Sequence, residues 1–148
     1  KSLMFFASGL VGLRYGTKEI DRIAGVLRTM PATGSLLILG ALALTGSPPF
    51  GIFISEFSIL TAGFRAGQTL AAVVVLILIA IIFIRLLDPI NRMVFGMAAA
   101  ELPRGEISRT ALVAMVATFI LVIGLGLVIP APLGELLRQG AAVLGGVS

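Results

Sequence analysis

Glu56 is the residue of this sequence that most strongly indicates chemistry. It lies inside an apolar stretch, residues 50–64, with Ser55 beside it and Ser58 two positions later. An acidic side chain near the centre of a membrane helix costs about 2.5–3.5 kcal/mol on insertion. A low-dielectric surrounding favours a neutral carboxyl, and a nearby cation favours the carboxylate. A group that switches between these states takes up and releases protons, so we interpret Glu56 as a proton relay. A paired or interfacial structural glutamate is the alternative.

An interruption of the helical pattern lies directly before Glu56. Pro48 and Pro49 stand between Ser47 and Phe50, and tandem prolines remove two backbone donors and clash with the preceding turn. Broken helices near the membrane midplane recur at the ion sites of transporters. The spacing fits a hairpin turn at the membrane surface equally well, and in both cases Glu56 lies within two helical turns of the interruption.

Lys1 is the second candidate for chemistry. The apolar run over residues 2–13 ends at Arg14, and twelve helical residues reach about 18 Å, whereas a hydrocarbon core is about 30 Å thick. We therefore expect this run to be the second half of a membrane helix, with preceding material outside the sequence and Lys1 inside the membrane. A buried lysine exchanges protons readily. A lysine that snorkels to the interface is the alternative.

A further group of residues lies within or beside the apolar runs and can support an ion path or a helix break. These candidates are Ser55, Ser58, Pro48, Pro49, Gly51 and Thr118. The hydroxyls among them can hold water along a path. The alternative for each hydroxyl is a bond to a carbonyl of its own helix, as is common for serine and threonine.

The elements that must position these residues are membrane helices. Of 148 residues, 58% are hydrophobic and 12% are charged, and the mean hydropathy is +1.13. Soluble domains carry about 25% charged residues. This composition excludes an ordinary cytosolic domain, a disordered tail and a nucleic-acid binder. The formal charge of +4 comes from basic residues between apolar runs, a pattern typical of contacts with the headgroups of a lipid bilayer.

The sequence contains no cysteine and no histidine. This excludes disulfides, thiolate metal sites, iron–sulfur clusters, haem held by histidine or cysteine, and histidine proton relays. We therefore expect no cofactor, no metal site and no catalytic redox residue in this chain.

The apolar pattern predicts an all-α integral membrane protein. The expected spans are 1–14, 31–46, 49–66, 69–88 and 110–129, followed by an interfacial amphipathic tail over 131–148. Residues 17–29 form a polar loop after Gly16, which is suited to cap the first helix. Residues 88–109 form a charged loop, because Pro89 disfavours a continuous helix there. The glycines expected at close helix contacts are Gly9, Gly12, Gly40, Gly124 and Gly126.

Basic residues indicate the orientation only weakly. Counted over five spans, the loops 14–28 and 85–109 lie on opposite sides of the membrane. Six basic residues then lie on the side of the first loop and four on the side of the second.

The string over residues 40–57, GALALTGSPPFGIFISEF, resembles the antiporter-like, proton-conducting membrane subunits of complex I and its hydrogenase relatives. In that family a glutamate or lysine lies in a broken helix of the second half-channel, after a Pro-Phe or Pro-Leu element, and Glu56 matches that position. The run that begins with Lys1 resembles the one headed by the family's buried lysine. Residues 91–96, 102–106 and 130–133 look most like hydrogenase-4 component F. The resemblance covers the whole chain, which corresponds to about the last third of such a subunit.

This resemblance implies a proton-translocating subunit, its C-terminal half-channel, in a redox-driven hydrogenase, formate hydrogenlyase or NADH–quinone oxidoreductase-type complex. Glu56 is then the gate and Lys1 its upstream partner. The implied partners are other membrane subunits and a peripheral redox arm, either nickel–iron hydrogenase-like or NADH dehydrogenase-like, at a bacterial or archaeal cytoplasmic membrane. The resemblance also implies that loop 85–109 faces the cytoplasm, against the charge count. The alternatives are a subunit of a Na+(K+)/H+ antiporter complex and a structural anchor that transports no ion.

Overall fold

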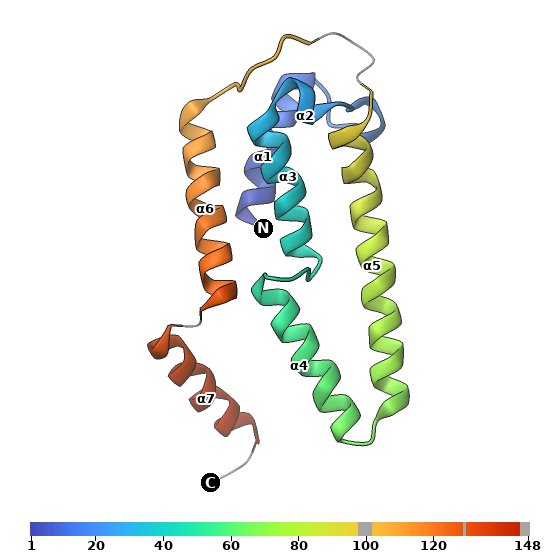
Figure 1. Ribbon diagram of the computed structural model, residues 1–148, viewed down its shortest axis with the longest axis vertical. Coiled ribbons are helices and arrows are strands. Elements are labelled where there is room, and N and C mark those ends of the chain that lie inside the picture. The colour runs from blue at the N-terminus through green and yellow to red at the C-terminus, as the bar shows by residue number, and fades with distance from the viewer. Residues whose placement is uncertain (98–101, 129, 146–148) are drawn as a thin grey trace.

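A computed structural model describes residues 1–97, 102–128 and 130–145, and the regular elements within these ranges are all helical (Figure 1). They are α1 (Ser2–Tyr15), the 3-10 helix η1 (Ile20–Arg22), α2 (Val26–Thr29), α3 (Pro31–Leu44), α4 (Gly51–Arg65), α5 (Thr69–Phe95), α6 (Arg109–Leu127) and α7 (Ala131–Gly145). Two of them, α5 and α6, are long and apolar enough to cross a membrane. The all-α prediction is therefore confirmed for the described residues, and the two long apolar helices fit the predicted membrane protein.

The buried core lies at one end of the molecule, where α3 packs against α1 and against the C-terminal part of α5 (Figure 1). Leu3, Leu10 and Val11 of α1 are buried, and their helical spacing places them on one face. A Cβ added at Gly40 of α3 would lie 2.9 Å from Sδ of Met4. Gly40 therefore allows the close helix contact that was expected of it.

The segment between α1 and α3 contributes to this core. Gly16 ends α1 in a left-handed conformation with φ 65°, as predicted. Ile23 and Met30 are buried, and the Tyr15 hydroxyl donates to the carbonyl of Ala24 at 2.8 Å. The prediction of a simple polar loop over 17–29 is incomplete, because apolar residues that lie between the charged ones in this segment pack into the core.

The segment that joins α5 to α6 returns to the same end. The Gly105 amide donates to the Thr29 carbonyl at 2.8 Å. The Glu106 carboxylate accepts from the amides of Ala32 at 2.8 Å and Thr33 at 3.2 Å. It caps α3, whose first amides have no partner inside the helix. The two loops are in contact, so the expectation that they lie on opposite sides of the membrane is wrong.

The interruption at the two prolines is a break within one helix. Figure 1 shows α4 continuing in roughly the direction of α3, beyond a break near mid-height of α5. The Phe50 amide donates to the Ser47 carbonyl at 3.1 Å, which spans Pro48 and Pro49, where no amide hydrogen exists. The broken helix is therefore confirmed, and the hairpin turn is excluded. Because α3 and α4 run in one direction, they are two parts of one interrupted helix rather than the two antiparallel arms of a hairpin.

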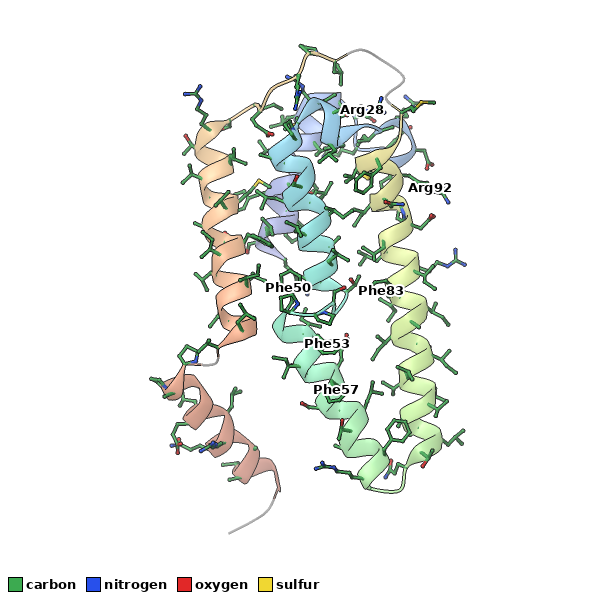
Figure 2. The ribbon with its side chains drawn as sticks, in the orientation of Figure 1. Arg28, Phe50, Phe53, Phe57, Phe83 and Arg92 are labelled. Atoms are coloured by element: carbon green, nitrogen blue, oxygen red, sulfur yellow. The ribbon has the colours of Figure 1, made fainter. Side chains whose placement is uncertain are left out.

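Helix α5 extends past residue 88, where its span was expected to end. Pro89 lies inside it, and the helix continues to Phe95. Met93 and Val94 of the last turn are buried in the core, and this packing offsets the hydrogen bond that proline removes. Arg92, labelled in Figure 2, pairs with Asp88 at 2.6 Å on the exposed side of the same turn.

Helix α7 covers most of the expected C-terminal tail and begins near the end of α6 that lies away from the core (Figure 1). Residue 129, assigned to the last span, and residues 146–148, assigned to the tail, lie outside the described residues, as do residues 98–101 of the charged loop.

Candidate functional site

Glu56 lies on the second turn of α4, and its carboxylate reaches back to the helix break. Gly46 adopts a left-handed conformation with φ 73°. A Cβ added at Gly46 would lie 2.7 Å from Cδ of Glu56 and 2.9 Å from Oε1, and nearer still to Oε2. Glu56 is half-buried. Its carboxylate therefore rests directly on the backbone of Gly46, in the space that a side chain at position 46 would fill.

The Glu56 carboxylate lines a groove of about 330 Å³ between α4 and α5. Phe53 and Phe57 of α4 form part of its wall, with ring centroids 6.0 Å apart, and Phe83 of α5 lies beside the break in Figure 2. Among the described residues that line the groove, Glu56 alone is charged, and Thr45 adds a hydroxyl. The carboxylate is therefore an isolated charge in a groove whose walls are otherwise mostly apolar.

Lys1 lies in a different pocket. It is exposed, and it lines a space of about 370 Å³ together with Gly51 and Ser55 of α4 and Val122 of α6. Glu56 faces the groove toward α5 instead. The structure thus brings both ionisable candidates to the helix break but places them on different sides of it.

Helix α6 packs against the backbone of the break. A Cβ added at Gly126 would lie 2.7 Å from the carbonyl oxygen of Pro49 and 2.9 Å from the amide nitrogen of Gly51. The ring of Phe50, labelled in Figure 2, packs against that of Phe119 of α6, with centroids 6.2 Å apart. Gly126 has the packing role expected of it, because it lets the backbone of the break rest directly on α6.

The candidate hydroxyls donate to their own helices. Ser55 donates to the Gly51 carbonyl at 3.3 Å. Ser58 donates to that of Ile54 at 2.7 Å, and Thr118 to that of Ala114 at 2.8 Å. Their oxygens retain lone pairs, so they can still accept a bond. Of these three described residues, Ser55 is the one that lines either of the two pockets beside the break.

Sequence reasoning missed Gly46 and Thr45 at this site. Pro48 and Pro49 indicated the break, but their spacing does not show in which direction the Glu56 side chain turns. The available signal was the Gly-Ser-Pro-Pro string, since glycine is the residue that takes a positive φ in a turn without steric cost.

The arrangement suits a single exchangeable ion. Within residues 1–97, 102–128 and 130–145, no three histidine, cysteine, aspartate or glutamate side chains come together as metal ligands. One carboxylate beside a broken backbone can hold a proton or a monovalent cation.

Comparison with known proteins gives matches over most of the chain. A family model described as "NADH:quinone oxidoreductase/Mrp antiporter, TM" matches residues 1–82. The hydrogenase-4 component F homolog of Methylacidiphilum infernorum (isolate V4) is 32% identical over 146 residues, which are 97% of this chain and 29% of that protein. The Na(+)/H(+) antiporter subunit A1 of Staphylococcus aureus (strain N315) is 34% identical over 68 residues, 46% of this chain and 8% of that protein. The chain spans less than a third of either relative.

One solved structure is similar in fold. A chain of the Mrp complex from Dietzia sp. DQ12-45-1b superposes with a TM-score of 0.69 at 20% identity, over 85% of this chain and 32% of that one. At this identity the similarity shows the arrangement of the helices alone.

Proposed function

Because this chain belongs to the family of membrane subunits common to NADH:quinone oxidoreductases and Mrp antiporters, we propose that it forms part of the ion path of a multisubunit membrane complex, with Glu56 as the ion-carrying group. One observation carries this proposal. The Glu56 carboxylate rests on the backbone of a broken helix, in a groove with otherwise uncharged walls. An ionisable group at an apolar membrane position costs free energy of insertion, and such groups mark ion paths in membrane proteins.

The finer proposal is a proton-translocating subunit of a hydrogenase, formate hydrogenlyase or NADH–quinone oxidoreductase-type complex. Its support is the similarity to the hydrogenase-4 component F homolog along nearly the whole chain, whereas the antiporter subunit matches less than half of it. Electron transfer in a peripheral redox arm changes the charge near Glu56 through the neighbouring membrane subunits. The carboxylate then takes up or releases a proton. Lys1, in the pocket on the other side of the break, is its partner in this exchange.

A subunit of a Na+(K+)/H+ antiporter complex is the second candidate. The match to the Staphylococcus aureus antiporter subunit over 68 residues favours it, and a single carboxylate can hold either ion. Sodium-dependent transport in the absence of any electron donor would identify this function.

We further propose that the end of the molecule formed by α2 and the two loops faces the cytoplasm of a bacterial or archaeal cell. The basic residues at that end are Arg14, Lys18, Arg22, Arg28, Arg92, Arg104 and Arg109, and those at the opposite end are Arg65 and Arg138. Cytoplasmic loops of membrane proteins carry an excess of lysine and arginine. With both loops at one end, the charge distribution and the family resemblance indicate the same orientation.

The test measures redox turnover and acidification together, in sealed vesicles that contain the intact host complex. Glu56→Gln is compared with Glu135→Gln, the same chemical change at an exposed site on α7. We expect Glu56→Gln to keep most of the turnover and to move fewer protons per electron, because an amide cannot release a proton. Glu135→Gln matches the wild type. Unchanged coupling in Glu56→Gln contradicts the proposal, and impaired assembly with normal coupling in the remaining complex supports a structural anchor.

A further inference from the structure

We propose that Gly46 is a positioning residue for Glu56. Because Gly46 has no side chain, the Glu56 carboxylate occupies the space beside the Gly46 backbone and rests against the helix break. We call this space the seat of the carboxylate. This inference rests on the proposed role of Glu56 in the ion path. It adds a residue that touches no ion itself and acts only through the place it leaves for the carboxylate.

The first support is steric. A methyl group at position 46 would overlap with the Glu56 carboxyl group, because the added Cβ would lie 2.7 Å from Cδ and 2.9 Å from Oε1. Cβ atoms in proteins essentially never lie within 3.0 Å of a heavy atom to which they are not bonded. The carboxylate and a side chain at position 46 therefore cannot both occupy this space.

The second support is that the break has little room to move away. On the far side, α6 touches its backbone at Gly126, where an added Cβ would lie 3.0 Å from Cα of Phe50 and 2.9 Å from the Gly51 amide nitrogen. The carboxylate side is the open one, since it borders the groove of about 330 Å³. A side chain added at Gly46 therefore displaces the carboxylate into the groove, toward Phe53 and Phe57, rather than the backbone into α6.

The chain supplies a matched control for backbone strain. Gly67, in the turn between α4 and α5, has φ 72°, which nearly equals the 73° of Gly46, and a Cβ added there meets no atom within 4 Å. Substitution of either glycine by alanine carries the same cost of a left-handed backbone. The substitution at Gly46 alone collides with a carboxylate.

The position of the carboxylate can be measured without reference to transport. Dicyclohexylcarbodiimide is an apolar reagent that modifies protonated carboxyl groups, and mass spectrometry of the peptide that contains Glu56 gives the labelling rate in the intact host complex. We expect Gly46→Ala to label Glu56 several-fold faster than wild type, because the carboxyl group leaves its seat for the open groove. Gly67→Ala is expected to label at the wild-type rate. Equal rates in the two alanine variants would overturn the proposal.

Ion movement per redox turnover is measured in the same vesicles. Gly46→Ala is expected to lower it and Gly67→Ala to leave it unchanged. Glu56→Asp is expected to lower it in the wild-type background but to restore part of it in the Gly46→Ala background, because the shorter side chain withdraws from the added methyl group. Additive losses in the double variant would show that Gly46 does not act through Glu56.

The two readouts separate this inference from the proposed function. Faster labelling with normal ion movement supports the seat and contradicts a role of Glu56 in transport. Normal labelling with reduced ion movement contradicts the seat and leaves that role intact. If Gly46→Ala does not assemble, Gly46→Asn takes its place with Gly67→Asn as control, because asparagine tolerates a left-handed conformation better than other residues with a side chain.

Discussion

The two halves of the broken helix are held in different ways. Seven residues of α3 are buried, whereas no residue of α4 is, although both halves are apolar. Helices α1, α2, α5 and α6 surround α3, while α4 lies along α5 and α6. Phe57 and Ile59 of α4 are 60% and 62% exposed. The buried helix α3 thus fixes the position of the break within the molecule, and the exposed helix α4 carries the ionisable Glu56.

Under the proposed function, this difference separates two requirements of an ion path. The break needs a constant position, which the core around α3 and the contact with α6 provide. The carboxylate needs surroundings that can change, and α4 has few buried contacts that would resist movement. Exposed apolar side chains on α4 carry little cost in a membrane, because lipid tails are as apolar as a neighbouring helix.

The largest expected effect is a loss of packing in α3 that has no counterpart in α4. Leu37 of α3 is 2% exposed and Ile59 of α4 is 62% exposed. Leu37→Ala leaves a cavity and costs about 2–5 kcal/mol of stability, whereas Ile59→Ala stays within about 0.5 kcal/mol. Unfolding of the purified complex in mixed micelles measures both. Equal losses would show that a partner covers α4 as tightly as the core covers α3.

A smaller effect is expected where the break rests on α6. Gly126→Ala forces the backbone of the break away and costs about 1–3 kcal/mol. Gly124→Ala is the control on the same helix, since a Cβ added at Gly124 would meet no atom within 4 Å. We expect this substitution to be neutral or to stabilise the protein by up to about 1 kcal/mol. Hydrogen exchange of α4 and α6 in the solubilised complex reports the change. If the two variants behave alike, α6 does not support the break.

The smallest effect concerns the loops at the packed end. Glu106→Ala removes the cap of α3 and costs about 1 kcal/mol, seen as faster hydrogen exchange in the first turn of α3. Glu19→Ala breaks an exposed pair with Arg22 and costs less than about 0.5 kcal/mol. If Glu106→Ala also speeds hydrogen exchange in α4, the two halves of the broken helix are not stabilised separately.

The sequence was sufficient for the features that depend on local composition. Long apolar runs predict membrane helices whatever surrounds them. Pro48 and Pro49 interrupt a helix because they lack amide hydrogens. Glu56 stands out because one carboxyl in an apolar run is costly in any arrangement. Gly16 was predicted as a helix cap for a similarly local reason, its tolerance of a positive φ.

Only the tertiary structure decided the features that depend on contacts between distant segments. Pro89 remains inside α5 because Met93 and Val94 beyond it are buried. The loops before α3 and after α5 meet through Gly105 and Glu106 because α4 continues the direction of α3 instead of turning back. No spacing rule predicts these contacts, since their partners lie more than seventy residues apart in the chain.

The sequence by itself therefore determined that this is a helical membrane protein with an acidic residue beside a helix break. The tertiary structure decided that α4 continues α3, that Lys1 and Glu56 lie on different sides of the break, and that Gly46 receives the carboxylate. The physical reason is the range of the forces involved. Backbone preferences and insertion costs act within a few residues, whereas the direction of a side chain depends on which segments close around it.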